Sequence, residues 1–518
     1  MVSVQVLPVG ERAFLLETGS LDEVLALLAA LESARPDGVV DLVPAARTVL
    51  VRVDPRVLPL SAARAWALGV AQAAQSAAAA PGETVELEVA YDGADLAETA
   101  ELLGVTPAEL VQRHTGAEWT VAFTGFAPGF GYLVSGDWPF DVPRLDAPRT
   151  RVPAGSVALA GEFSGAYPRD TPGGWRLIGT TGARLFDPDA ASPALLAPGT
   201  RVRFRELSGG SSPVRASTGS PAAVRPPDGA SIEVVEPGLL ATLQDLGRAG
   251  SAALGVATSG ALDRAALRTA NRLLGNGENA AAIEVTMGGF RAVARSELWF
   301  AVTGAWGPIR LDGHEVDPFQ AHRWPAGAEL HVDWFAHGAR ACLAVRGGLD
   351  GPPALGSRAT DLLAGLGPAP LRRGDVIGVR DDIAGPIPVG PPALWGMPHD
   401  DELVLELAPG PRADWFAPAA HEQLFEAVWT VTSDADRVGV RLDGPELARI
   451  RTGELASEGM VPGALQVPPS GRPTILLSDG PVTGGYPVIA VVTDAALDLL
   501  AQARPGTGIR FRHARTAS

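Results

Sequence analysis

Residues 152–155, 173–178 and 198–204 read VPAG, GGWRLI and PGTRVRF, and three similar segments return in the same order near the C-terminus. The second set reads VPGA at 461–464, GGYPVI at 484–489 and PGTGIRF at 505–511. Three matches in one order are difficult to obtain by chance. The repeat predicts two related β domains, paired about a pseudo-twofold axis. A cleft between such domains is a usual place for a ligand.

The chain is too long for a single core, because 518 residues exceed the size at which proteins divide into domains. Its 61 glycines and 45 prolines indicate many turns, so we expect a mainly β protein with α+β parts. Residues 208–230 are rich in Gly, Ser and Pro without apolar periodicity, which predicts a flexible linker. The expected domains are an α/β cap at 1–80, a β domain at 81–207 and a second half at 231–518.

The expected cap mixes strands with helices. Residues 49–53 read VLVRV, which is typical of a strand. Ser20 and Glu23 have the spacing of a capping box that opens an apolar helix through Leu31. The Ala-rich residues 61–80 predict a second helix. After Pro81 the sequence predicts mainly short strands. A capping box at residues 106–109 predicts the start of one further helix.

The charge of the chain limits its partners. A formal net charge of −17 argues against nucleic acid and anionic membranes, and no apolar run is long enough to cross a bilayer. All 42 basic residues are arginine, so any bound anion must be held by Arg, by backbone N–H groups or by a metal. The single cysteine, Cys342, lies in an apolar segment and is expected in a strand core. One unpaired cysteine suits a reducing compartment, so we expect a cytoplasmic protein.

Two segments of the first half are candidate ligand loops. Residues 123–132, FTGFAPGFGY, combine four aromatic residues with three glycines. Such a loop lets the backbone approach a ligand between aromatic walls, although a packed β-bulge with core aromatics would show the same composition. Residues 143–156 hold three arginines between prolines, which suits a carboxylate or phosphate or else a solvated loop. Ser156 has no histidine near it in sequence to act as a base.

Other candidates are less specific. The Gly173–Gly174 turn offers successive N–H groups for an anion nest. In the second half, Arg437 and Arg441 lie four residues apart, and Glu458 precedes the repeated Val-Pro-Gly as a candidate general base. Histidine and cysteine spacing predicts no metal site built by the protein alone.

These segments resemble a known family. Residues 1–207 resemble the B subunit of 5-oxoprolinase, also called the Kip inhibitor or allophanate hydrolase subunit 1, through residues 125–132, 152–156 and 172–175. Residues 231–515 are similar to the C subunit of that enzyme, the Kip antagonist or allophanate hydrolase subunit 2 of the carboxyltransferase-domain family. The matching segments of this half are 237–248, 259–263, 270–271, 436–442, 457–469 and 483–487.

The resemblance implies two cyclophilin-like β-barrels and a small N-terminal α/β cap. It implies an ATP-dependent 5-oxoprolinase, with ATP and magnesium, that phosphorylates the lactam oxygen of 5-oxoproline so that water can open the ring to glutamate. It also implies a separate partner, the A subunit of 5-oxoprolinase, which is of the LamB/YcsF type, while the formation of a homo-oligomer stays open. Catalytic roles are expected for Glu458 and Arg441. Ligand contacts are expected from Phe126, Pro128, Gly129, Tyr132, Arg149, Arg151, Ser156, Gly173, Gly174, Trp175, Arg437, Gly484 and Gly485.

Two departures from the family keep other functions open. Val488 stands where relatives often carry a lysine, and residues 255–260 read GVATSG rather than the family's Gly-Val-Pro-x-Ser-Gly. One alternative is the carboxyltransferase module of a urea carboxylase, whose biotin carrier would have to be another chain because no lysine is present to carry biotin. The other is a regulator that binds a sensor kinase.

Overall fold

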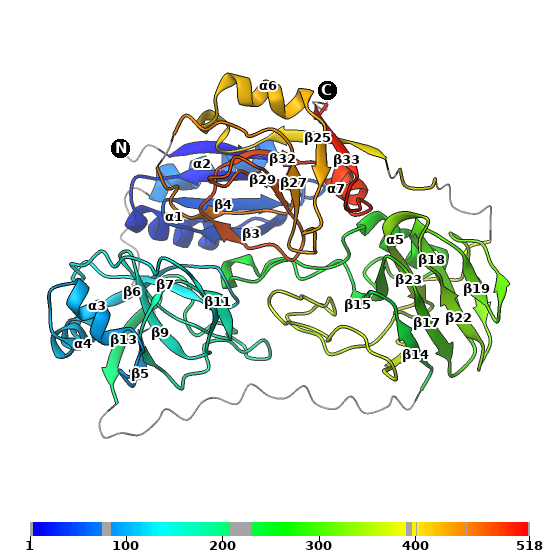
Figure 1. The fold of residues 1–518 in the computed structure, drawn as a ribbon, viewed down its shortest axis with the longest axis horizontal. Coiled ribbons are helices and arrows are strands. Elements are labelled where there is room, and N and C mark those ends of the chain that lie inside the picture. The colour runs from blue at the N-terminus through cyan, green and yellow to red at the C-terminus, as the bar shows by residue number, and fades with distance from the viewer. Residues whose placement is uncertain are drawn as a thin grey trace.

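The computed structural model describes residues 4–74, 84–207, 229–389, 396–399, 401–451 and 453–515. Figure 1 shows four bodies in chain order, which are the cap, a first barrel, a two-sheet sandwich and a second barrel. The predicted linker at 208–230 lies outside the described residues, except for its last two positions. None of the helices in these ranges is long and apolar enough to cross a membrane.

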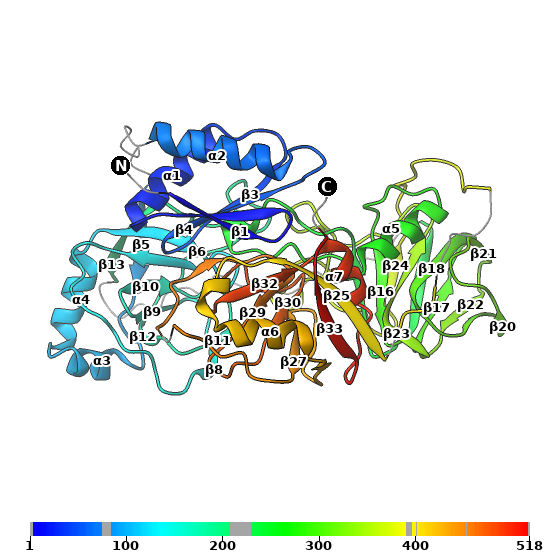
Figure 2. The same ribbon diagram turned by 90° about the horizontal axis from the view of Figure 1, so that it is seen from above.

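The cap is a four-stranded sheet with two helices on one face (Figure 2). Its elements are β1 (Gln5–Val9), β2 (Ala13–Glu17), α1 (Leu21–Ser33), β3 (Val39–Pro44), β4 (Thr48–Val53) and α2 (Leu60–Ala74). The capping box is confirmed, because the Ser20 side chain accepts a hydrogen bond from the N–H of Glu23. Phe14, Leu16 and Val51 pack with apolar residues of the two helices.

The first barrel is a seven-stranded sheet that is nearly closed. Its strands are β5 (Thr84–Val89), β6 (Trp119–Thr124), β7 (Gly131–Val134), β9 (Ser156–Ala160), β10 (Phe163–Ala166), β12 (Arg176–Thr180) and β13 (Arg201–Glu206). A bridge between Ala90 and Thr180 joins the two ends of this sheet. The helices α3 (Leu96–Leu102) and α4 (Pro107–Gly116) flank the barrel, and β8 (Arg149–Val152) pairs with β11 (Thr171–Gly173) beside it.

The second barrel is closed. Its strands are β25 (Glu402–Pro409), β26 (Trp429–Val431), β27 (Gly439–Asp443), β29 (Ala464–Gln466), β30 (Thr474–Leu476), β32 (Val488–Val492) and β33 (Gly508–His513). Helices α6 (Pro418–Glu426) and α7 (Asp494–Leu500) cover it, and β28 (Glu458–Gly459) pairs with β31 (Thr483–Gly484).

The predicted duplication is confirmed by hydrogen bonds that repeat in the two barrels. The N–H of Gly199 donates to the carbonyl of Val121 at 2.8 Å, and the N–H of Gly506 donates to that of Val431 at 2.8 Å. Both glycines have positive φ, at 84° and 91°, which other residues adopt only at a cost. In each barrel the last strand then pairs in parallel with the first.

One detail of the predicted repeat needs correction. Gly155 and Gly463 both have positive φ and directly precede β9 and β29. The two turns therefore correspond through these glycines, so the Val-Pro pairs at 152–153 and 461–462 are offset by one residue. The shared Val-Pro pair suggested the wrong alignment, because the turn requires a glycine with positive φ but does not require the proline.

A sandwich of two sheets separates the barrels along the chain, which the sequence did not predict. One sheet contains β14 (Ser231–Pro237), β17 (Phe290–Ala294), β19 (Ile309–Leu311), β20 (His314–Glu315), β22 (Glu329–Val332) and β24 (Val376–Gly378). The other contains β15 (Leu240–Gln244), β16 (Ala282–Thr286), β18 (Leu298–Trp306), β21 (His322–Trp324) and β23 (His337–Val345). Helix α5 (Arg264–Leu273) packs on the second sheet. Cys342 is buried in β23, as predicted.

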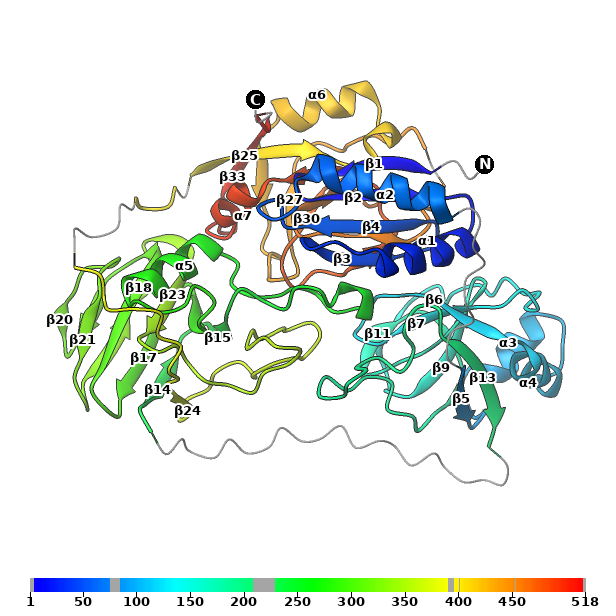
Figure 3. The same ribbon diagram turned by 180° about the vertical axis from the view of Figure 1, so that it is seen from behind.

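The cap also packs on the second barrel, on the face of its sheet opposite its own helices (Figure 3). Leu15 and Leu50 lie in one buried cluster with Met460, Val461 and Val491. The N–H of Gly10 donates to the carbonyl of Pro409 at 3.0 Å. The sheet of the cap is thus covered on one face by its own helices and on the other by the second barrel. The first and last bodies of the chain are therefore in contact.

Candidate functional site

A cavity of about 80 Å³ lies between the two barrels. Phe126, Pro128 and Pro172 line it from the first barrel. From the second barrel, residues 479–482 contribute. The 351–371 loop of the sandwich adds Asp361 and Leu363. All three bodies therefore meet at this inter-barrel cavity.

Glycines allow the bodies to meet so closely. A Cβ added at Gly125 would lie 1.8 Å from Oγ1 of Thr483, which no structure tolerates. A Cβ added at Gly255 would lie 2.8 Å from the carbonyl oxygen of Ala127. The N–H of Gly129 donates to the carbonyl of Leu254 at 2.9 Å. Gly125 therefore leaves room for a side chain of the second barrel and Gly255 for a backbone carbonyl, while an approach of the 123–132 loop to a ligand stays a prediction.

Phe126 is the aromatic residue of the 123–132 loop that reaches the cavity. Its φ is 64°, a strained value for a residue with a side chain, and 41% of the residue is exposed. The other expected aromatics pack together, since Phe130, Tyr132 and Trp175 share one buried cluster. Burial raises the pKa of Tyr132 to about 12. The loop thus combines both readings of its sequence, with a packed core and one residue held outward.

Two buried carboxylates line the cavity, and the sequence analysis missed both. Asp361 and Asp479 are 1% and 0% exposed. Burial, followed by the neighbouring charge of Asp479, raises the pKa of Asp361 to about 6. Oδ1 of Asp361 accepts from the N–H of Ala364 at 2.8 Å, whereas its Oδ2 is buried without a hydrogen-bond partner. A carboxyl group with this pKa can take up or release a proton near neutral pH.

The two carboxylates differ in their partners. Asp479 accepts two hydrogen bonds from Arg437, one from Oγ of Ser259 at 2.7 Å and one from a backbone N–H. Asp361 faces Nη1 of Arg248 only at 3.8 Å. This difference in pairing allows Asp479 to keep its negative charge while Asp361 exchanges a proton.

Arg437, an expected ligand contact, is bound by protein groups. It is 2% exposed, and besides Asp479 it contacts Glu284 of β16 at 2.5 Å and the carbonyl of Gly260 at 2.6 Å. It therefore connects the sandwich to the second barrel and holds Asp479 at the cavity. A direct contact between Arg437 and a ligand stays a prediction.

The structure does not bring the other arginine candidates to the cavity. Arg149 pairs with Asp95 at 2.6 Å, and Arg151 pairs with Asp170 at 2.6 Å on the surface. Gly173 lies in the β11–β8 ladder, and neither it nor Gly174 has positive φ. The left-handed residue of an alternating nest is therefore not found at these two glycines, and their contact with an anion stays a prediction. Ser156 is buried at the start of β9.

The expected catalytic pair is also apart from this cavity. Glu458 is buried and accepts a hydrogen bond from Nε of Arg412 at 2.8 Å, and Arg412 also contacts Glu17 of the cap. Burial raises the pKa of Glu458, opposed by Arg412. Arg441 is exposed on β27 and donates to the carbonyl of Asp434 at 2.7 Å. Gly484 and Gly485 follow Thr483, next to the cavity wall. The catalytic roles of Glu458 and Arg441 stay predictions.

Comparison with protein families places both halves. The carboxyltransferase domain, subdomain A and B, matches residues 254–513, and the carboxyltransferase domain, subdomain C and D, matches residues 4–196. A solved structure of a protein named TTHA0988 is similar over 97% of this chain and 99% of its own, with 38% identity and a TM-score of 0.84.

Curated relatives match the two halves separately. The C subunit of 5-oxoprolinase from Escherichia coli (strain K12) is 37% identical over 289 residues, which cover 54% of this chain and 90% of that protein. The B subunit of 5-oxoprolinase from Escherichia coli O157:H7 is 47% identical over 123 residues, 23% of this chain and 56% of that protein. The urea amidolyase of Lachancea kluyveri is 35% identical over 312 residues, 54% of this chain but 17% of that protein.

Proposed function

Because the chain belongs to the carboxyltransferase-domain family and carries subdomains A to D on one polypeptide, we propose that it is the fused B and C component of an ATP-dependent 5-oxoprolinase. One observation supports this most. Segments similar to the B and C subunits of 5-oxoprolinase line the same inter-barrel cavity. In this cavity the charge of one buried carboxylate, Asp479, raises the pKa of the other, Asp361. The substrate would be 5-oxoproline, and a separate LamB/YcsF-type partner would complete the reaction.

The chemistry explains why activation is needed. A five-membered lactam is a stable amide, so water attacks it slowly. ATP supplies a phosphoryl group to the lactam oxygen, which makes the ring carbon electrophilic; water then adds, the ring C–N bond breaks and phosphate leaves. In our proposal the chain described here carries out activation and the LamB/YcsF-type partner carries out hydrolysis.

The residues of the inter-barrel cavity fit the lactam better than the nucleotide. Phe126, Pro128 and Pro481 offer apolar contacts to a small ring. Asp361 would hold or release a proton beside the ring amide, while Asp479 keeps a fixed charge next to it. The triphosphate of ATP does not fit here, because the charged groups of the lining are carboxylates and the buried Arg437 is already bound by two of them. Magnesium stays a proposal and would arrive with ATP, because no cluster of three or more metal-ligating side chains is found among the described residues.

The test is an activity assay of the purified chain with and without the LamB/YcsF-type partner. We expect glutamate from 5-oxoproline only when both proteins and ATP are present, with release of ADP. Asp361→Asn should lower product formation by about a hundredfold or more while the protein still folds. Absence of glutamate under all conditions, with both proteins folded and associated, would reject the proposal.

One observation favours a second function. The similarity to a urea amidolyase and the matched family descriptions suggest a carboxyltransferase that acts with a biotin carrier on another chain. In that case the same preparation should transfer a carboxyl group from carboxybiotin to an amide, without need of the LamB/YcsF-type partner. The two activities are measured side by side, so each result assigns one function.

A further inference from the structure

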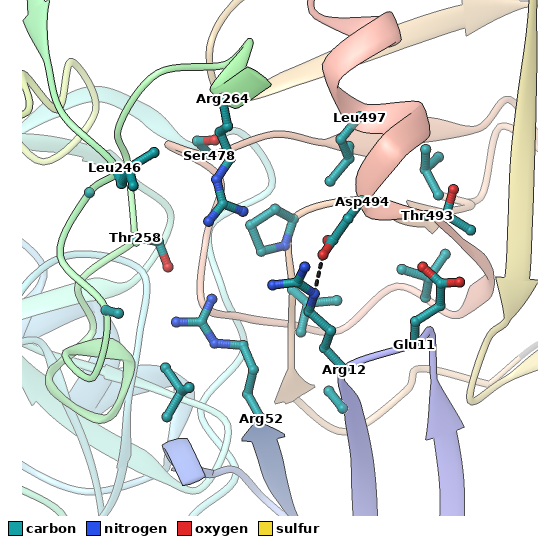
Figure 4. A pocket seen from close by; sticks show the side chains of 18 of the residues that line it. Glu11, Arg12, Arg52, Leu246, Thr258, Arg264, Ser478, Thr493, Asp494 and Leu497 are labelled. Atoms are coloured by element: carbon teal, nitrogen blue, oxygen red, sulfur yellow. Dashed lines mark ion pairs between the residues drawn. The ribbon is translucent and has the colours of Figure 1, made fainter. Parts of the chain in front are cut away.

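A larger cavity, of about 290 Å³, lies where the cap, residues 246–268 and the second barrel meet. Figure 4 shows its interior, in which the side chains of Arg12, Arg52 and Arg264 point toward a common space. We call it the arginine cavity. Its remaining walls are mainly aliphatic, with the hydroxyl groups of Thr258 and Ser478 at one side.

The lining concentrates positive charge in an acidic protein. Five arginines line the arginine cavity against three carboxylates, although the whole chain carries a formal charge of −17. Apolar side chains bury the adjoining cap–barrel interface, and Arg12 is the lining arginine that pairs across it, with Asp494. Charge of one sign gathered in a concave site attracts ligands of the other sign.

Most of these arginines are held in place by a carboxylate on one side. Arg12 pairs with Asp494, and Nε of Arg52 donates to Asp41 at 2.7 Å. Arg56 and Arg268 pair with Asp54 and Glu278. These pairs fix the direction of each guanidinium group while leaving donors for a further acceptor, since the group has five N–H donors. The site is therefore arranged before a ligand arrives.

Arg264 differs from the other four. It begins α5, its Nε is buried without a hydrogen-bond partner, and no ion pair is found for it within the described parts of the chain. Asp498 accepts from its backbone N–H at 3.0 Å, not from its guanidinium group. Burial and then the nearby Arg268 lower its pKa, while Asp494 and Asp498 oppose this. A partly buried cation with an unused donor lacks an anionic partner.

We propose that the arginine cavity binds the phosphate group of a small phosphorylated molecule. Converging guanidinium groups match the geometry and the charge of phosphate, and in a chain without lysine arginine is the side chain that is always positively charged. The inference stands apart from the proposed lactam chemistry, because binding is measured on this chain alone and without turnover.

The position of the arginine cavity relates it to the inter-barrel cavity. Ser478 lines the arginine cavity, and the next residue, Asp479, lines the inter-barrel cavity. A small void lined by Thr258, Ser478 and Gly480 lies between them. The 477–482 segment therefore contributes to the walls of both cavities.

The experiment is isothermal titration of the full chain with pyrophosphate, orthophosphate, ATP and succinate. We expect saturable binding of pyrophosphate, and Arg264→Gln should weaken it by about ten- to a hundredfold, the range for one charge-assisted hydrogen bond. Arg264→Lys, which keeps the charge, should fall between. Arg295→Gln removes one guanidinium group from the exposed surface of the sandwich, where it pairs with Glu233, and this control variant should bind as the unchanged chain does.

Each outcome decides the proposal. If ATP binds more tightly than pyrophosphate, the proposal is supported and a nucleotide is identified as the source of the phosphate. If ATP and pyrophosphate bind equally, the result supports a site that recognises the phosphate alone. Succinate bound as tightly as pyrophosphate overturns the assignment to phosphate. No saturable binding, or equal affinity in Arg264→Gln with an unchanged melting temperature, overturns the site. If Arg264→Gln does not fold, Arg12→Gln is measured in its place with the same criteria.

Discussion

Arg437 binds both carboxylate oxygens of Asp479, with Nε and Nη2 each 3.0 Å from an oxygen. The same guanidinium group contacts Glu284 of the sandwich, so one buried cation joins two bodies of the fold. Because Arg437 holds Asp479, which lines the inter-barrel cavity, the site depends on the assembly of the chain.

Arg437→Met should destabilise the protein by about 3–5 kcal/mol, because two buried carboxylates would lose their partner. The triple variant Arg437→Met, Asp479→Asn, Glu284→Gln should recover part of this loss, since no buried charge then remains unpaired. Calorimetric melting measures both. If Arg437→Met had the same melting temperature as the unchanged chain, the network would contribute nothing to stability.

Asp361 should control the pH dependence of activity. If it acts as a base, kcat/KM falls as the pH drops through about 6, because the carboxylate becomes protonated. Asp361→Asn should lower activity by about a hundredfold or more and remove this acidic limb. An unchanged profile in Asp361→Asn would assign the limb to another group.

The same raised pKa has a consequence for stability. Below the unfolded pKa near 3.8 both states are protonated at Asp361, and above about 6 both are ionised. Between these values the folded state binds more protons, so stability falls as the pH rises. Asp361→Asn should therefore melt higher than the unchanged chain at pH 7, with a smaller difference at pH 4. The opposite order at pH 7 would contradict the shift.

Gly125→Ala should separate the barrels, because the new Cβ would overlap Oγ1 of Thr483. Thr483→Ala should restore part of the assembly in the double variant, since the remaining Thr483 Cβ, at 3.1 Å, needs to shift by only a few tenths of an ångström. Gly116→Ala is the control, as no atom lies within 4 Å of the added Cβ. Melting temperature and activity report the result. Normal behaviour of Gly125→Ala alone would mean that the barrels shift apart without cost.

Leu50→Ala should loosen the cap from the second barrel. Leu50 is 1% exposed in their shared cluster, and removing such a side chain costs about 2–5 kcal/mol. Val57→Ala, at an exposed position of the cap, should cost almost nothing. Denaturant titration of both variants gives the comparison. Equal midpoints would indicate that the cap–barrel contact forms without Leu50.

Local signals in the sequence predicted local structure well. The capping boxes at Ser20 and Thr106 begin α1 and α4, with the expected hydrogen bonds from Glu23 and Glu109. The three repeated segments predicted the duplicated barrel because they form turns and strands with fixed backbone requirements. The equivalence of Trp119 and Trp429 was missed. Each indole donates to a carbonyl at the end of the preceding helix, at 3.0 and 3.2 Å, although the residues around them differ.

The site was less accessible to sequence reasoning because contacts distant along the chain create it. Asp361 lies in an ordinary loop sequence, and its unusual environment comes from burial beside Asp479, 118 positions later. The arginine-rich segment 144–151 was conspicuous, but Arg149 and Arg151 are used in ion pairs with Asp95 and Asp170. The arginines that converge in the arginine cavity come from separate elements, so no segment of the sequence displays them together.

The cap precedes the first barrel in the chain, yet it buries apolar surface on the second. If the two halves were separate polypeptides, their complex would depend on the concentration of each, and dilution would release it. On one chain the encounter is intramolecular, at an effective concentration that dilution does not change. Fusion therefore fixes the stoichiometry of the two halves at one to one, and the assembled state forms equally well whether the protein is scarce or abundant.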